Sequence, residues 1–192
     1  MKKILVINGH PNVDALGSEF ARIYSQAARE AGFEVKLTNL ADLAFDPILH
    51  KGYLKIQDLE PDLLQAQKDI QWAEHIVISF PMWWSSVPAL LKGFLDRVLL
   101  PGFAFKYHKN DPFWDRLLKG RTGRIIFTTD APWFYNWIVN RDPTIRMMKT
   151  GTLEFCGIKP VGVTQLDSLK SRKPQEIEKF LKKIKELGSK GK

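Results

Sequence analysis

The sequence lacks the features that mark secreted and membrane-spanning proteins. It has 192 residues and a single cysteine, Cys156, so no internal disulfide can form, which suits a reducing compartment. No apolar stretch approaches the roughly 20 residues that a membrane-spanning helix needs. The apolar run near the N-terminus is too short for a signal peptide. We therefore expect a cytoplasmic protein that does not insert into a membrane.

Several well-known site motifs are also missing. The first glycine-containing loop fits neither G-x-G-x-x-G nor G-x-x-x-x-G-K-[ST], which disfavours a Rossmann dinucleotide site and a nucleoside triphosphatase. His50, His75 and His108 are scattered without metal-ligand spacing, and no nucleophile elbow is present. We predict no metal site, and Cys156 falls in an apolar helical pattern that indicates a packing role.

The chain has fewer acidic than basic residues. The chain has 29 Lys and Arg against 21 Asp and Glu, a formal net charge of +8. Much of the excess lies in residues 170–192, where charges alternate on an amphipathic helical pattern. This pattern is typical of a solvated terminal helix, with residues 188–192 as a flexible tail. A basic balance favours anionic partners such as phosphates, nucleic acid or a membrane surface, and the solvated helix disfavours nucleic acid among them.

Strand and helix patterns alternate along the whole chain, without a repeat or a linker. The apolar periodicity predicts five strands and five helices. This order indicates one α/β domain over residues 1–192, a doubly wound three-layer sandwich around a five-stranded parallel sheet in the order 2-1-3-4-5. The strands are expected at residues 3–8, 33–38, 76–80, 123–129 and 159–165, and the helices at residues 16–31, 63–73, 88–98, 144–156 and 174–187.

The ligand site of such a fold lies outside the carboxyl ends of the strands, where the strand order reverses. The ends of the first, third and fourth strands meet there. We therefore expect the site to be built from the loops at residues 9–17, 81–87 and 130–143.

The loop at residues 9–17 leads into the N-terminus of a predicted helix. The free N–H groups and the dipole of a helix N-terminus favour binding of an anion. His10 either donates to a phosphate or bonds a local carbonyl, and the sequence leaves both interpretations open. For Asp14, the cap of the following helix is the favoured role.

The second loop places Trp83 and Trp84 directly after the most apolar strand, which ends at Pro81. Backbone groups there are suited to bind the edge of a flat heteroaromatic ring, with an indole as apolar wall. The alternative is that a tryptophan packs on the neighbouring helix, and we expect this of at least one of the two.

The third loop is rich in aromatic residues, which indicates a stacking site or a subunit contact rather than plain exposure to solvent. The residues concerned are Trp133, Phe134, Tyr135 and Trp137, followed by Arg141.

The central stretch F-P-M-W-W-S-S-V-P-A-L-L-K-G-F-L-D-R-V, residues 80–98, resembles the signature of the NAD(P)H:quinone oxidoreductases, the DT-diaphorase family with its flavodoxin-like fold. The resemblance extends to G-H-P after the first strand, L-A-F-D-P at residues 43–47, T-T after the fourth strand and F-C-G-I at residues 155–158. It covers nearly the whole chain and is strongest toward the bacterial branch of the family.

The resemblance implies a homodimeric flavoprotein that takes hydride from NAD(P)H and passes two electrons to a quinone or a related acceptor. In the family, the loop after the first strand holds the flavin phosphates, and the other two loops border the isoalloxazine ring. The residues at cofactor-binding positions are His10, Asp14, Ala15, Leu16, Gly17, Pro81, Met82, Trp83, Trp84, Ser85, Thr128, Thr129, Asp130 and Ala131. Those at substrate-binding positions are Phe105 and Tyr107, which reach into the partner's pocket, and Trp133 and Tyr135.

The chain departs from the family pattern at three places. Asp14, Ala15 and Gly17 stand where Ser, Thr and Asn side chains are usual, so phosphate binding depends more on backbone N–H groups and His10. Asp130-Ala131 replaces Gly-Gly and adds a carboxylate near the flavin. Tyr135 is within one place of a catalytic tyrosine but has no histidine partner, and it is the one catalytic candidate.

We therefore predict a flavin-dependent NAD(P)H oxidoreductase that works by ping-pong exchange. The alternatives are a flavodoxin-like electron carrier and a flavin-free ancillary subunit of a potassium efflux system, which would have a membrane partner. The sequence leaves open FMN against FAD, NADH against NADPH, and the acceptor.

Overall fold

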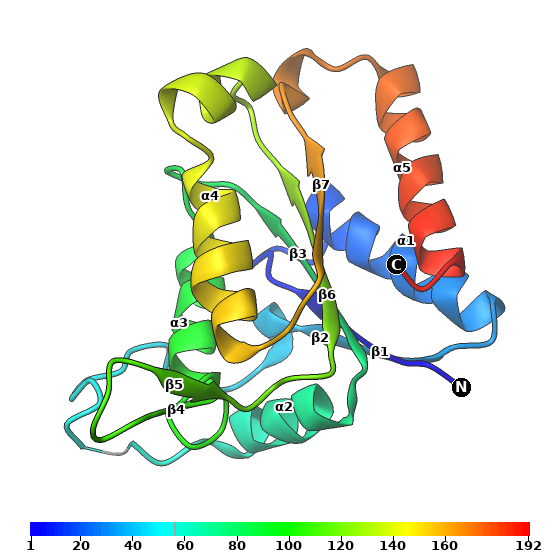
Figure 1. The fold of residues 1–192 in the computed structure, drawn as a ribbon. Coiled ribbons are helices and arrows are strands. Elements are labelled where there is room, and N and C mark those ends of the chain that lie inside the picture. Colours follow the sequence, from blue (N-terminus) through cyan, green and yellow to red (C-terminus); the bar gives the residue numbers. More distant parts are fainter. Residues whose placement is uncertain (56) are drawn as a thin grey trace.

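The computed structural model describes residues 1–55 and 57–192, and its centre is a five-stranded parallel sheet (Figure 1). The strand order is β2-β1-β3-β6-β7, which is the predicted 2-1-3-4-5 order once the sheet strands are numbered consecutively. The flavodoxin-like prediction is therefore confirmed. The strands are β1 (Lys3–Asn8), β2 (Glu34–Asn39), β3 (His75–Pro81), β6 (Thr122–Thr128) and β7 (Val161–Leu166).

The strands form because their apolar residues supply both faces of the sheet. In β1, Leu5 and Ile7 point into one core, while Ile4 and Val6 point into the other. All seven residues of β3 are buried, as expected for the central strand of a sheet covered on both sides. The site at the carboxyl edge is thus supported by rigid, fully packed elements.

Helices cover both faces of the sheet (Figure 1). α1 (Leu16–Glu30) and α5 (Pro174–Ser189) lie side by side on one face, and they approach closely where Gly188 meets Tyr24. A Cβ at Gly188 would lie 2.5 Å from the Tyr24 carbonyl oxygen. The other face carries α2 (Pro61–Trp72), α3 (Ala89–Val98) and α4 (Pro143–Ile145), which runs on into the π-helical segment η3 (Arg146–Glu154).

Several short elements were not predicted from the sequence. The antiparallel strands β4 (Phe105–Tyr107) and β5 (Trp114–Arg116) form a separate two-stranded sheet, and the third loop contains a π-helical turn, η2 (Tyr135–Val139). Two 3-10 turns, η1 (Leu40–Asp42) and η4 (Leu169–Ser171), follow β2 and β7. Elements of three to five residues are too short to show a clear period in the sequence.

The long excursion before α2 is tied to α3 by a buried arginine. Arg97 has no exposed surface, and its guanidinium donates to the carboxylate of Glu60 and the carbonyl of Asp58, each at 2.8 Å, and to the carbonyl of Asp46. Gly93 permits this contact, because a Cβ there would lie 2.5 Å from the Pro47 carbonyl oxygen. Ile56 lies outside the described residues.

The C-terminal tail differs from the expected flexible segment at residues 188–192. The helix continues to Ser189, and the Lys192 N–H donates to the Leu187 carbonyl at 3.1 Å. The Tyr24 hydroxyl donates to the Lys192 carbonyl, and the Lys2 ammonium donates to the Gly191 carbonyl. These bonds fix the tail against the start of the sheet.

Among the described residues, no helix has both the length and the apolar character needed to cross a bilayer.

Candidate functional site

A cavity of about 210 Å³ lies at the carboxyl edge of the sheet, where β1, β3 and β6 end. In the sheet, β2 lies on one side of β1 and β3 lies on the other. The strand order therefore reverses at β1 and β3, next to the cavity. The cavity is lined by His10, Ala15, Leu16, Gly17, Pro81, Met82, Trp83, Thr128, Thr129, Asp130 and Leu169.

The loop after β1 is held in place by a network of side-chain hydrogen bonds. The amide of Asn8 donates to the Ser18 hydroxyl at 2.9 Å, and its oxygen accepts from the His10 N–H at 3.2 Å. The Ser18 hydroxyl also donates to the Asn12 carbonyl at 2.7 Å. Because Asn8 and Ser18 are buried, this loop is fixed before any ligand binds.

The start of α1 offers two backbone donors. The N-cap residue of α1 is Ala15, and no side chain caps the helix. The expectation that Asp14 is the cap is therefore wrong. Asp14 is exposed, and its N–H bonds to the Asn12 side chain. Among the described residues, the N–H groups of Leu16 and Gly17 have no hydrogen-bond acceptor. With the helix dipole, they form an anion-binding end directed at the cavity.

His10 adds a third donor beside them. Its Nδ1 accepts a hydrogen bond from the Asn12 N–H at 2.9 Å, so the neutral ring carries its proton on Nε2. Burial lowers the pKa of His10 below its usual value, which keeps the ring neutral at pH 7. The two roles expected for His10 were a donor to a phosphate and a local backbone bond. The structure shows a local bond in which Nδ1 accepts, and the Nε2–H stays available to donate to a ligand.

The loop after β3 is a tight turn with an uncommon backbone. The N–H of Trp83 bonds to the Ser86 carbonyl at 3.1 Å, and the Ser86 N–H returns the bond to Trp83 at 2.9 Å. Between them, Trp84 and Ser85 both have positive φ, 53° and 55°, as in a type I′ turn, although neither is glycine. Strained conformations of this kind gather at functional sites.

The two tryptophans have different surroundings. The Trp83 ring meets the His10 ring edge-on, with centroids 5.7 Å apart, and lines the cavity. The Trp84 side chain is fully exposed. The expectation that a tryptophan packs on the neighbouring helix is therefore wrong for Trp84, and Trp83 packs on the first loop.

The end of β6 closes the other side of the cavity. The Thr128 carbonyl accepts from the Met82 N–H at 2.8 Å, which carries the ladder one residue past Pro81. Asp130 faces a cation, because its carboxylate lies 3.0 Å from the Lys170 Nζ and also accepts from the Lys170 N–H. The extra carboxylate noted in the sequence is therefore partly neutralised by the chain itself.

The structure brings together most of the predicted cofactor-binding residues. The cavity lining contains predicted residues from all three loops, and Leu169 is the lining residue that was not predicted. The predicted residues outside the lining are Asp14, Trp84, Ser85 and Ala131, together with Phe105, Tyr107, Trp133 and Tyr135.

Phe105 and Tyr107 lie in another part of the molecule. Phe105 is buried in its own chain, with its ring 5.1 Å from that of Phe155, so its side chain is not free to reach a partner. Tyr107 is 61% exposed and remains available for such a contact. Both line a second cavity of about 190 Å³, beside Cys156, whose pKa burial raises to about 12.

The sequence also contained signals for the residues that were missed. Leu169 and Lys170 follow β7, which neighbours β6, so their loop reaches the same edge of the sheet. The Leu169 N–H donates to the Thr129 carbonyl at 3.1 Å, which holds η4 against the cavity. Asn8, a polar residue at the end of an apolar strand, was the other available signal.

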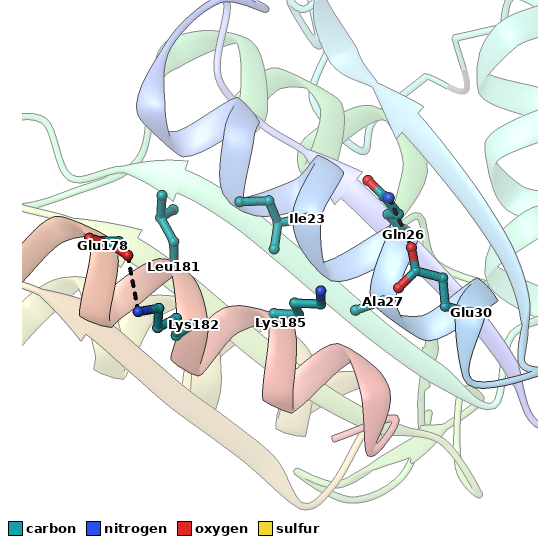
Figure 2. A pocket seen from close by; sticks show the side chains of 8 residues that line it. All are labelled: Ile23, Gln26, Ala27, Glu30, Glu178, Leu181, Lys182 and Lys185. Atoms are coloured by element: carbon teal, nitrogen blue, oxygen red, sulfur yellow. Dashed lines mark hydrogen bonds and ion pairs between the residues drawn. The ribbon is translucent and has the colours of Figure 1, made fainter.

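A groove of about 220 Å³ lies between α1 and α5, away from the strand ends (Figure 2). Its floor is apolar, formed by Ile23, Ala27 and Leu181, and its rim is charged. Four of the five polar rim side chains bond to a neighbour on their own helix, Gln26 with Glu30 and Lys182 with Glu178, as the dashed lines in Figure 2 show; the fifth is Lys185.

The chain belongs to the Flavodoxin_2 family, described by its flavodoxin-like fold, whose model matches residues 2–187. The resemblance stated from the motifs is thereby confirmed.

Individual relatives carry oxidoreductase names. An uncharacterized NAD(P)H oxidoreductase of Haemophilus influenzae is 39% identical over 163 residues, covering 82% of this chain and 79% of the relative. The ribosyldihydronicotinamide dehydrogenase [quinone] of Pongo abelii is 30% identical over 183 residues, covering 82% and 78%. The crystal structure of Smu.1420 from Streptococcus mutans superposes with a TM-score of 0.84 at 28% identity, covering 98% of this chain and 99% of the other.

Proposed function

We propose that this protein is a flavin-dependent NAD(P)H oxidoreductase that reduces quinones or related acceptors by two-electron hydride transfer. One observation carries the proposal. Three hydrogen-bond donors come from residues that line the cavity where the strand order reverses: the N–H groups of Leu16 and Gly17 and the Nε2–H of His10. None of the three has an acceptor among the described residues of this flavodoxin-like chain. The related enzymes named above support the same class of reaction.

The residues present fit a flavin. A flavin phosphate would be held by the free N–H groups at the start of α1 and by the Nε2–H of His10, whose neutral ring needs no compensating anion. Pro81, Met82 and Trp83 supply one wall for a flat ring, and Thr128 and Thr129 supply the other. When bound, the flavin accepts hydride from the nicotinamide and delivers two electrons to the acceptor. FMN and FAD both remain candidates.

The chain contributes orientation and electrostatics. Since Trp84 and Ser85 have no backbone acceptor for their N–H groups among the described residues, these donors are available to a polar ring edge. Donors fixed in this way stabilise negative charge that develops during reduction. The Lys170 ammonium reduces the repulsion between Asp130 and that charge.

The test is a spectrum followed by an assay. Purified protein, as isolated and after addition of FMN or FAD, should show bound oxidised flavin, and mass analysis of released cofactor should identify it. NADH or NADPH should bleach the flavin anaerobically, and a water-soluble quinone should restore it. Failure to bind either flavin would contradict the proposal. Binding without reduction by NAD(P)H would instead identify an electron carrier.

We also propose that the protein works as a homodimer in the cytoplasm. The exposed Tyr107 on β4 is the residue that would contact the partner, and the single cysteine suits a reducing compartment. Light scattering during size exclusion measures the mass, and a monomer at working concentration would contradict the dimer. Fractionation of the source cells tests the compartment.

A further inference from the structure

The third loop buries one polar side chain among exposed apolar ones. In η2, the side chains of Trp137 and Ile138 are 60% and 61% exposed, whereas Asn136 is 3% exposed. An apolar side chain would be the ordinary choice for the inner position, because a primary amide loses its hydrogen bonds to water when it is buried. The buried position of Asn136 therefore directs attention to what its amide contacts.

Asn136 is placed by the main chain. Its N–H donates to the Pro132 carbonyl at 3.3 Å, and its carbonyl accepts from the Asp142 N–H at 2.8 Å. These two bonds do not involve the side chain. The side-chain amide donates to the Thr129 hydroxyl oxygen at 3.5 Å, and its own oxygen has no partner among the described residues. The one bond that the amide makes there thus runs to the end of β6.

Thr129 is fixed in the wall of the cavity. It is 3% exposed, and its N–H and carbonyl bond to Leu166 and Leu169 at 2.9 and 3.1 Å. Its hydroxyl oxygen accepts from the Ala131 N–H at 3.2 Å and from the Asn136 amide. A hydroxyl has two acceptor lone pairs and one donor proton. Both acceptor positions are therefore used, and the proton has no acceptor among the described residues.

We propose that Asn136 is a positioning residue that holds the Thr129 hydroxyl as a hydrogen-bond donor to the bound flavin. The inference rests on the proposed function and gives the third loop a buried role in it. Tyr135, the catalytic candidate from the sequence, is 44% exposed and lies outside the cavity lining. A donor that is oriented before the ligand binds stabilises negative charge that develops on the ring during reduction. The pair should therefore favour reduced over oxidised flavin.

A purely structural role for the pair makes a different prediction, and the chain offers a matched control. Thr144 is 1% exposed, its hydroxyl has no partner among the described residues, and it lies outside the cavity lining. Replacing either threonine by valine removes a buried hydroxyl and keeps the shape of the side chain. If the hydroxyl of Thr129 serves only packing, both substitutions should change stability and leave the flavin potential unchanged.

The first experiment measures the midpoint potential of the flavin that the parent binds, by anaerobic reduction against an indicator dye. Thr129→Val should weaken the binding of reduced flavin about tenfold relative to oxidised flavin, which lowers the two-electron potential by about 30 mV. Thr129→Ser keeps the hydroxyl and should stay within about twofold of the parent. Thr144→Val should leave the potential unchanged.

The second experiment asks whether Asn136 acts through Thr129. Asn136→Leu removes the amide and leaves the hydroxyl without its fixed direction, so the preference for reduced flavin should fall about fivefold. Because Asn136 acts only through the hydroxyl, the double variant Thr129→Val/Asn136→Leu should match Thr129→Val alone. Circular dichroism and denaturant unfolding check the fold, and Asn136→Ala, with the same expectation, takes the place of a leucine variant that does not fold.

Three results would overturn the proposal. They are a parent-like potential in Thr129→Val, additive effects in the double variant, and a higher potential in Asn136→Leu. The last would show that the hydroxyl donates to Asn136 and that removing the amide releases it. If the parent binds flavin and NAD(P)H reduces it while Thr129→Val keeps the parent potential, this inference fails and the proposed function stands. If the parent binds neither FMN nor FAD, both fail.

Discussion

Two hollows in this molecule have nearly the same size and very different chemistry. The cavity at the carboxyl edge has a volume of about 210 Å³, and the groove between α1 and α5 has about 220 Å³. In the groove, four of the five polar side chains on the rim bond to a neighbour on their own helix. In the cavity, three N–H donors have no acceptor among the described residues.

The difference follows from how each hollow is made. The groove remains where two helices separate beyond the close contact of Gly188 with Tyr24, so its lining is side-chain surface. The cavity forms where parallel strands stop and a helix begins, so backbone groups that cannot be satisfied internally converge there. Unpaired donors, rather than volume, distinguish the candidate site from the groove.

The largest expected effect comes from placing a negative charge in the cavity. Gly17→Glu sets a carboxylate beside His10 and the start of α1, where it opposes the flavin phosphate and favours its own contact with the free N–H groups. We expect flavin affinity to fall about 100-fold or more, or about 2.7 kcal/mol. Fluorescence titration with FMN and FAD measures this change.

The matched control uses the same helix and the same charge in the groove. Gln26→Glu should leave flavin affinity within about twofold, because the site is on α1 but away from its N-terminus. An equal loss of affinity in both variants would mean that the start of α1 is not the phosphate site.

The second prediction concerns acid sensitivity that is independent of the cavity. Burial, with Lys2 and Arg124 nearby, lowers the pKa of His75 from 6.5 to about 3. As pH falls below 6.5 the unfolded chain binds a proton that the folded chain rejects, so stability is lost from pH 6.5 toward 3, at up to about 1.4 kcal/mol per pH unit. Urea unfolding between pH 6.5 and 5 measures the slope.

His75→Asn keeps a polar group near Thr122, which bonds to His75 Nδ1 at 2.7 Å, and removes the titration. It should reduce the slope in that window, where carboxylates contribute little, and leave the part that comes from His10, whose pKa burial also lowers. An unchanged slope would assign the acid sensitivity to another group.

The third prediction tests the helix contact that borders the groove. Gly188→Ala puts a methyl group 2.5 Å from the Tyr24 carbonyl oxygen, so the helices must separate. We expect a loss of about 1 to 3 kcal/mol in unfolding free energy, with flavin affinity unchanged. Denaturant unfolding and flavin titration of the same sample check both parts.

Gly151→Ala is the control, since a Cβ there would lie 3.6 Å from the nearest heavy atom, the Arg146 carbonyl oxygen, in ordinary contact. It should be neutral or stabilising by up to about 1 kcal/mol. Equal destabilisation by both substitutions would show that the close approach at Gly188 is not the cause.

The smallest expected effect concerns the charge at the edge of the cavity. Lys170→Ala leaves the Asp130 carboxylate unpaired beside the flavin, and affinity should fall about threefold, as expected for an exposed pair. Adding Asp130→Asn to Lys170→Ala should restore the parent affinity. Failure of the double variant to recover would contradict the charge argument.

The sequence allowed the sheet and most of the cavity to be predicted, because both depend on strong local signals. Buried strands such as β3 show as continuous apolar runs, and strand ends locate the edge. Contacts made by single side chains across the fold gave no such signal. The pairing of Asp130 with Lys170 joins residues 40 positions apart, and the burial of Phe105 depends on Phe155. The β4–β5 pair and η2 were too short to detect.

The turn at Trp84 and Ser85 has a stereochemical consequence. Both residues have the backbone handedness that suits a D-amino acid, and L side chains hold it at a cost of order 1–3 kcal/mol each. A chain assembled by chemical ligation with D-alanine at position 84 should therefore fold more stably than one with L-alanine there. If the chain with D-alanine also binds flavin as tightly as the parent with Trp84, the backbone handedness at this position matters more for binding than the indole side chain.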